Sequence, residues 1–434
     1  MLLLHLSNEL LCCIAENLEL ERDINAFTQA NCRIYRLLNP YLYRYNIKQS
    51  KSSALLWAAQ NDQEGTAQKL LEERIHDQAM NDYWIPLCVA ARNGYGGIVK
   101  LLLSKGTKVN AKGAYYAHAL RAASYGGHET IARLLLEKGA DVNAESEEYG
   151  NALGAASSGG HEAIAKLLLK NGADIESRDQ FGYTPLISAA RAGHLEVVKL
   201  LLENGADFTV FSDALWRPHV VAALHGHVNV VQLLLEKGAD PAQIPFAEDD
   251  WTPLNAAAHG GHLEVVKLLL ENGADLTVFG DQLRRALSVA AFHGHVNVVQ
   301  LLLEKGTIPS ASVEDGWTPL ISAAKGGHLE VVKLLLENGA DLTVFGDQLR
   351  RALSEAAFHG HVNVVQLLLE KGTDPSASVE DGWTQLNAAT RGGHLEVAKL
   401  LLEKGADSTV LTEDNRALLN SAAKESHLEV AKLA

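Results

Sequence analysis

The sequence predicts an all-α solenoid, in which short helical pairs stack in a row, because one histidine recurs at a spacing of 33 residues. Each of these corner histidines follows a short segment rich in alanine and precedes a leucine-rich segment. One helical pair cannot bury its own leucines, so successive pairs must stack on each other. The corner histidines are His128, His161, His194, His227, His262, His295, His328, His361, His394 and His427, with one step of 35 residues between His227 and His262.

Residues 1–48 do not follow this period, and their apolar side chains recur at helical spacing in three short groups. Three short helices with a leucine-rich start resemble an F-box, with Ser7 where that family usually has proline. The resemblance implies that this domain docks to Skp1, the adaptor of a cullin-type ubiquitin ligase. The implied Skp1 contacts are Leu6, Glu9, Leu10, Leu11, Ile14 and Leu18. The alternative is a helical cap that only covers the first repeat.

The stretch Gly182–Asp207 shows the repeated unit most clearly. Thr184 predicts a helix start, because its hydroxyl can accept a hydrogen bond from an unpaired backbone N–H. The proline that follows suits the first helical position, where an N–H is not needed. Ala189 and its neighbour let another helix come close, and Gly205 predicts a left-handed helix end. The corner histidine is expected to make a local hydrogen bond at the turn.

This pattern resembles the ankyrin repeat. Thr-Pro-Leu stands intact at 184–186, 252–254 and 318–320, and a triple leucine with a Gly-Ala-Asp or Gly-Thr exit appears in nearly every unit. The match covers residues 52–434, about twelve units, of which the last is incomplete. The resemblance implies two antiparallel helices and a β-turn finger in each unit, with a concave face that binds proteins. An F-box-like domain followed by this array is similar to fungal F-box–ankyrin proteins.

Two consecutive repeats form a larger duplicated block. The segments Trp251–Gly316 and Trp317–Gly382 are almost the same 66 residues, and each contains one repeat with Trp-Thr-Pro-Leu and one with Arg-Arg-Ala-Leu.

A ladder of large side chains is expected at the root of the fingers, eleven residues before the corner histidines and before Tyr95, which stands one repeat ahead of His128. The repeats of His128 and His161 have Ala117 and Gly150 at this position. In ankyrin arrays this position faces the groove, and Tyr, Trp and Arg are enriched at binding hot spots. The alternative is packing alone, with each Trp on the neighbouring finger and each Arg over a Trp face. The candidate groove residues are Trp84, Tyr183, Trp216, Trp251, Arg284, Trp317, Arg350, Trp383 and Arg416.

Composition narrows the classes of partner and compartment. The net charge of −15 argues against nucleic acid, whose phosphates need a basic surface, and it favours a basic or mixed protein partner. The four cysteines show neither metal nor disulfide spacing, which fits a reducing compartment, the cytoplasm or the nucleus. We expect no membrane partner, because no apolar run is long enough to span a bilayer.

Neither metal binding nor catalysis is predicted. The pairs His225/His227, His293/His295 and His359/His361 have no cysteine or carboxylate at ligand spacing, so no metal or other cofactor is expected. The sequence has no nucleophile elbow, phosphate-cradling glycine loop or metalloprotease helix, and therefore no candidate catalytic residue. An enzyme or small-molecule binder that uses the groove remains a third alternative.

The sequence therefore predicts a non-enzymatic substrate receptor of an SCF-type (Skp1–cullin–F-box) ubiquitin ligase. Residues 1–48 would recruit a Skp1-like adaptor, and the repeats at 52–434 would hold an unidentified target protein. The principal alternative is an ankyrin scaffold with no role in ubiquitin transfer.

Overall fold

The computed structural model describes ten long stretches of the chain, together with residue 413 and the short stretch 415–417. They are residues 53–73, 84–110, 118–145, 150–208, 217–242, 251–274, 280–310, 317–339, 346–376, 384–411, 413 and 415–417. The predicted F-box-like domain, 1–48, with its six implied Skp1 contacts, lies outside these residues. The chain divides into two compact units, Met1–Ala214 and Leu215–Ala434, which we call the N-terminal and the C-terminal unit.

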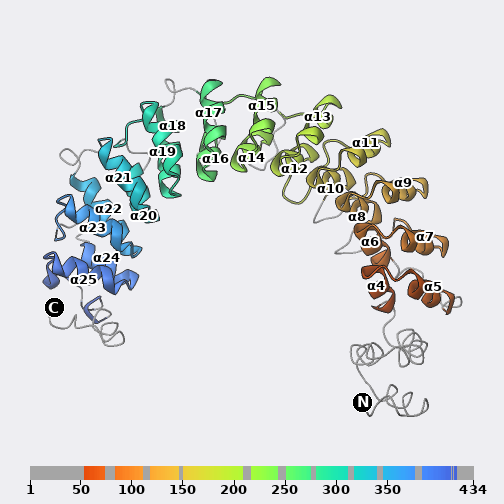
Figure 1. Ribbon diagram of the computed structural model, residues 1–434, viewed down its shortest axis with the longest axis horizontal. Helices are drawn as coiled ribbons and strands as arrows, with labels where there is room; N and C mark the ends of the chain where they lie inside the picture. Colours follow the sequence, from red (N-terminus) through yellow and green to blue (C-terminus); the bar gives the residue numbers. More distant parts are fainter. Residues whose placement is uncertain are drawn as a thin grey trace, which may run out of the picture. The chain divides into compact units, whose positions relative to one another are not determined.

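Five helical pairs are described in the N-terminal unit, and Figure 1 shows them as two rows. The first helices of the pairs are α4 (Ser53–Gln60), α6 (Trp84–Asn93), α8 (Ala119–Gly126), α10 (Ala152–Gly159) and α12 (Pro185–Ala192). The second helices are α5 (Glu64–Glu73), α7 (Gly96–Ser104), α9 (Glu129–Glu137), α11 (Glu162–Lys170) and α13 (Leu195–Glu203).

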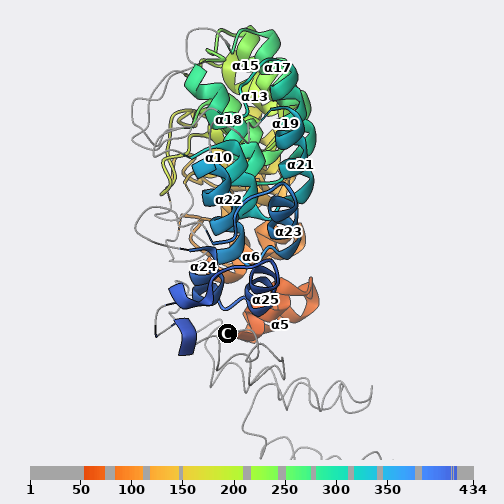
Figure 2. The same ribbon diagram turned by 90° about the vertical axis from the view of Figure 1, so that its left-hand side faces the viewer.

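Six further pairs are described in the C-terminal unit, where Figure 2 separates α18, α22 and α24 from α19, α21 and α23. The first helices are α14 (Pro218–Leu224), α16 (Pro253–Gly260), α18 (Gly280–Phe292), α20 (Pro319–Gly326), α22 (Gly346–Phe358) and α24 (Gln385–Gly392). The second helices are α15 (Val228–Glu236), α17 (Leu263–Glu271), α19 (Val296–Glu304), α21 (Leu329–Glu337), α23 (Val362–Glu370) and α25 (Leu395–Glu403), followed by the short η5 (Ser408–Val410).

Within each unit, the first helix of a repeat packs closely on the first helix of the next repeat. Small side chains allow this approach, and Ala189 and Ala190 on α12 are fully buried. The second helix contributes larger apolar groups, of which Val197, Val198 and Leu201 on α13 are buried. The described residues confirm the stacked all-α solenoid that the period predicts.

The predicted helix boundaries are confirmed in the repeat that contains Thr184. Its backbone is extended, and its Oγ1 accepts from the N–H of Ile187 at 3.3 Å, which caps α12. Gly193 ends α12 with a φ of +77°, and Gly205 follows α13 with a φ of +89°. The expected β-turn finger is described at Asp179–Tyr183, where the carboxylate of Asp179 accepts from the N–H groups of Phe181 and Tyr183, each at 2.9 Å.

The corner histidines join one repeat to the one before it, so the expected local hydrogen bond was wrong. His194 Nε2 donates to the carbonyl oxygen of Ser158 at 3.1 Å, 36 residues earlier. A side chain on Gly160, whose φ is +74°, would overlap the ring of His194. Glycine is therefore required there both by the left-handed backbone and by the next repeat's imidazole.

The two extra residues between His227 and His262 leave this contact unchanged. His262 Nε2 lies 3.0 Å from the carbonyl oxygen of Leu224, across 38 residues instead of 36. The insertion is therefore absorbed between α15 and α16, in the segment that joins the two repeats.

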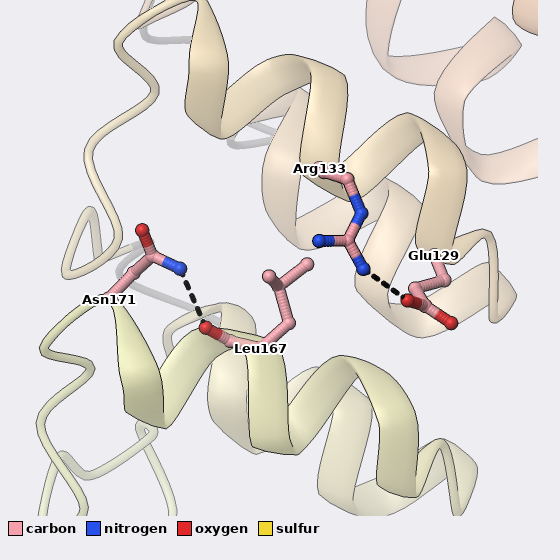
Figure 3. A network of polar contacts seen from close by, with 4 residues as sticks. All are labelled: Glu129, Arg133, Leu167 and Asn171. Atoms are coloured by element: carbon pink, nitrogen blue, oxygen red, sulfur yellow. Dashed lines mark hydrogen bonds and ion pairs between the residues drawn. The ribbon is translucent and has the colours of Figure 1, made fainter.

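The polar contacts of the second helices that Figure 3 shows join residues four positions apart in the sequence. Figure 3 shows the ion pair between Arg133 and Glu129 within α9, at 2.6 Å, and the bond from Asn171 Nδ2 to the Leu167 carbonyl at the end of α11, at 2.8 Å. Exposed pairs of this kind contribute about 0.3–0.5 kcal/mol each. In the described part of the chain, no helix combines the length and the apolar character that crossing a bilayer requires.

Candidate partner-binding surface

The aromatic ladder residues lie where the repeat pattern places them. Tyr183, Trp251 and Trp317 immediately precede the capping threonines of α12, α16 and α20, and all three are half-buried. Trp84 is the first residue of α6 and is also half-buried. Two predicted members, Trp216 and Trp383, lie outside the described residues.

The arginine members differ from the expectation that they precede a helix. Arg284 and Arg350 lie inside α18 and α22, which have 13 residues each, whereas α16 and α20 have 8. These two repeats lack the Thr-Pro start, so the helix extends back to include the segment Gly-Asp-Gln-Leu, whose leucine is buried. The last member, Arg416, is exposed, and its Nη2 donates to the carbonyl of Ser408 at 3.4 Å.

Three of the described aromatic ladder residues, Tyr183, Trp251 and Trp317, pack on the residue eight positions later, near the end of their own first helix. The Nζ of Lys325 lies 4.7 Å from the centre of the Trp317 ring, and the guanidinium carbon of Arg191 lies 5.7 Å from the Tyr183 ring. A cation over an aromatic face contributes about 0.5–1 kcal/mol at such partly exposed sites. These rings therefore contact residues of their own repeat, whereas the packing alternative placed each Trp on the neighbouring finger.

Within the duplicated block, the aromatic and the basic residue occupy opposite positions in alternate repeats. Where the rung is Arg284 or Arg350, the residue eight positions later is Phe292 or Phe358, each 39% exposed. These repeats therefore have a basic residue at the first of the two positions and an aromatic residue at the second. The two positions are separated by a fixed offset of eight residues in the sequence, and the predicted ladder contains only the first of them.

Two histidines from adjacent repeats meet beside this surface. The rings of His259 and His293 lie 4.1 Å apart, between Trp251, at 4.7 Å from His259, and Phe292, at 5.0 Å from His293. Partial burial lowers the pKa of both imidazoles, and the neighbouring His295 lowers both further. The two rings are therefore held in the neutral form at neutral pH, with ring N–H groups available as donors.

The histidine pairs that the sequence singled out are stacked. The ring centres of His225 and His227 lie 6.2 Å apart. Among the described residues, no group of three or more His, Cys, Asp or Glu side chains has an arrangement that could hold a metal ion. The described Cys88 is buried, and burial raises the pKa of its thiol to about 12. A thiol in that state is not a nucleophile at neutral pH.

The model of the family "Ankyrin repeats (3 copies)" matches residues 26–113, 119–212, 212–280, 279–346 and 353–433, which is most of the chain. The chain belongs to the ankyrin-repeat family. Among solved structures, it is similar to the crystal structure of the human ASB11 ankyrin repeat domain, with 32% identity over 51% of this chain and 97% of that one, at a TM-score of 0.45. No curated protein matches the chain.

Membership of this family makes the described array a protein–protein interaction module, on a scaffold that is typically non-enzymatic. The first family match begins at residue 26, inside the range 1–48 that the sequence predicts as a separate domain. The ladder and its basic partners lie on the first helices, so these helices carry the candidate partner-binding surface of this ankyrin-repeat protein.

Proposed function

We propose that this ankyrin-repeat protein is the substrate receptor of an SCF-type ubiquitin ligase, and that its first helices bind the target protein. The observation that supports target binding is a half-buried ring that lies beside a basic group at the same place in two repeats, those of α12 and α20. Trp317 with Lys325 and Tyr183 with Arg191 are the clearest described cases.

Such aromatic ladder residues suit a binding role because their side chains lose little conformational entropy when a partner docks. A tryptophan already held by a cation of its own helix costs less side-chain entropy on binding than a mobile one. Half-burial leaves part of the ring for contact, and Trp, Tyr and Arg are the residues that dominate binding energy at interfaces.

The link to ubiquitin rests on the F-box resemblance of residues 1–48. A Skp1-like adaptor would bind through the leucine-rich start of this segment. An adaptor site at one end of the chain and a target surface on the repeats would bring the ligase core to the bound target, in the cytoplasm or the nucleus.

The test uses purified full-length protein and purified Skp1. The wild type is expected to retain Skp1 in a pulldown, and the double substitution Leu10→Asp with Leu11→Asp is expected to abolish that retention, because two carboxylates would have to be buried in an apolar contact. The double substitution Trp251→Ala with Trp317→Ala should retain Skp1 and lose the target that co-purifies with the wild type. Circular dichroism of each variant shows whether the array remains helical.

A second candidate function is an ankyrin scaffold without a ubiquitin role. The family match that starts at residue 26 favours it, because residues 26–48 would then belong to the array itself. Absence of Skp1 binding by the wild type, together with target loss in the tryptophan variant, would decide for the scaffold.

A further inference from the structure

Six consecutive repeats of the C-terminal unit each carry one basic or titratable side chain at the end of the first helix. It stands two or three residues before the corner histidine, and we call these residues the basic row. Its members are His225, His259, His293, Lys325, His359 and Arg391. In the N-terminal unit the corresponding series is interrupted, since neither Tyr125 nor Ser158 is basic and the residues that follow them are glycines.

The basic row lies at the surface and is lined with aromatic rings. All six side chains are half-buried or exposed. Phe358 contacts His359 at 5.1 Å between ring centres, much as Phe292 contacts His293 at 5.0 Å. The row therefore offers imidazole N–H donors, and positive charge at Lys325 and Arg391, against apolar ring surface.

The charges around the row are mostly positive or titratable. His259 and His293 face each other and His295, and His293 also faces His328 at the start of α21. His359 faces Lys325 on α20, His361, His394 and the carboxylate of Glu355, whose Oε2 lies 3.7 Å from its Nε2. Of the described groups that act electrostatically on these three histidines, Glu355 is the acidic one.

Two acidic side chains of the neighbouring second helices form ion pairs within their own helices. Lys267 holds Glu264 on α17, and Lys333 holds Glu330 on α21, each at 2.8 Å. Within the row, Lys325 and Arg391 are the members that carry positive charge at neutral pH, so a basic partner would meet like charge at these two positions.

We infer that the basic row binds an acidic, extended peptide segment, with one carboxylate over each repeat. This inference deepens the proposed target-binding role and depends on it. Neighbouring helices of stacked repeats lie about 8–10 Å apart. A polyproline II segment advances about 3.1 Å per residue with three residues per turn, so every third side chain points the same way, at intervals of about 9 Å. A segment with an acid at every third position therefore matches the spacing of the repeats, while His259 and His293, whose ring centres lie 4.1 Å apart, converge on the same part of the segment.

Binding of such a segment is coupled to proton uptake. A bound carboxylate favours the charged form of His259, His293 and His359, whose pKa values burial lowers in the unbound protein. Affinity for the peptide is therefore expected to rise on acidification, by about threefold or more between pH 7.5 and pH 6.0.

The experiment measures fluorescence anisotropy of labelled peptides with the full chain. The probe is a peptide of about five Glu-Pro-Pro repeats, about 45 Å long. A peptide of the same composition with its glutamates clustered at one end should bind more weakly, and a Lys-Pro-Pro repeat should not bind. Equal affinity for the spaced and clustered peptides would overturn the match of spacing, and tighter binding of a deoxythymidine oligonucleotide would overturn the peptide as occupant.

Two matched variants locate the site. Lys325→Glu in the row is expected to weaken binding about tenfold, whereas Lys333→Glu on α21, with the same change in net charge, should alter it less than about twofold. His259→Ala with His293→Ala should reduce the rise on acidification. Equal effects of the two lysine variants would overturn the inference. Skp1 retention by the same preparations separates this outcome from failure of the receptor proposal.

Discussion

His219 occupies a position where other first helices carry leucine, as Leu186 does in α12 and Leu254 in α16. Its side chain is 2% exposed, and neither ring nitrogen has a hydrogen-bond partner. Burial lowers the pKa of this imidazole to about 4, and the charge of Arg217 lowers it further, against the opposing effect of Asp240. The fold thus tolerates a polar ring in a leucine site by keeping it neutral.

This residue makes the stability of the array depend on pH. Below pH 6.5 the unfolded chain takes up a proton that the folded chain binds only near pH 4, so stability is lost as the pH falls through this window. At pH 5 the loss is about 2 kcal/mol. His219→Leu should remove it, so urea unfolding followed by circular dichroism should show a wild-type deficit that grows between pH 7 and pH 5.

A second substitution separates titration from packing. His219→Ala removes the same titrating group but leaves a cavity, so it should lack the pH-dependent component and be less stable than His219→Leu at every pH. A difference between wild type and His219→Leu that stays constant from pH 7 to pH 5 would contradict this account.

At the scale of the element, first helices of equal length begin with different residues. α12, α16 and α20 begin with a capping threonine followed by proline, whereas α24 begins with Thr384 and Gln385. The Gln385 side chain is fully buried, and both polar atoms of its amide lack a hydrogen-bond partner. α24 therefore carries a buried amide at a position where α12, α16 and α20 have proline.

Gln385→Pro is expected to stabilise the protein. Thr384 has φ −99° and ψ 158°, which a residue before proline adopts readily, so the ring can be accommodated without rebuilding the cap. Removing an unsatisfied buried amide and restricting the unfolded chain together should raise the free energy of unfolding by about 1–3 kcal/mol. The reverse change in α20, Pro319→Gln, should lower it by a similar amount. Urea unfolding of both variants checks this, and a destabilising Gln385→Pro would show that the amide has a role in the native packing.

Sequence reasoning succeeds at this scale where the signal is local. Thr184, Gly193 and Gly205 fix helix ends through contacts within a few residues, and the structure confirms them. The extra length of α18 depends on burial of Leu283 against other helices, which no local rule contains. The partners of the ladder also needed the structure, since an offset of eight residues becomes a contact only when the helix geometry is known. The implied Skp1 contacts stay a prediction.

At the scale of the C-terminal unit, duplication makes neighbouring interfaces nearly interchangeable. The helices α18 and α22 differ at one position, Val289 against Glu355, and α19 and α23 have the same sequence. In the present chain α24 packs on α22 and α25 on α23. If one duplicated block were removed, α24 and α25 would meet α18 and α19, which present almost the same side chains.

Deletion of residues 317–382 is therefore expected to give a folded, cooperative protein. Its helical signal per residue should equal that of the full chain, while the urea m-value should fall by about 15%, in proportion to the surface removed. Deletion of the single repeat 307–339 is the control, because it removes α20 and α21, keeps α22 whole and would place it directly on α18, a pairing of two extended first helices that the described structure does not contain. That variant should unfold at a lower urea concentration than the two-repeat deletion. If both deletions unfold at the same concentration, stability depends only on the number of repeats, and the alternation of two helix types carries no energetic weight.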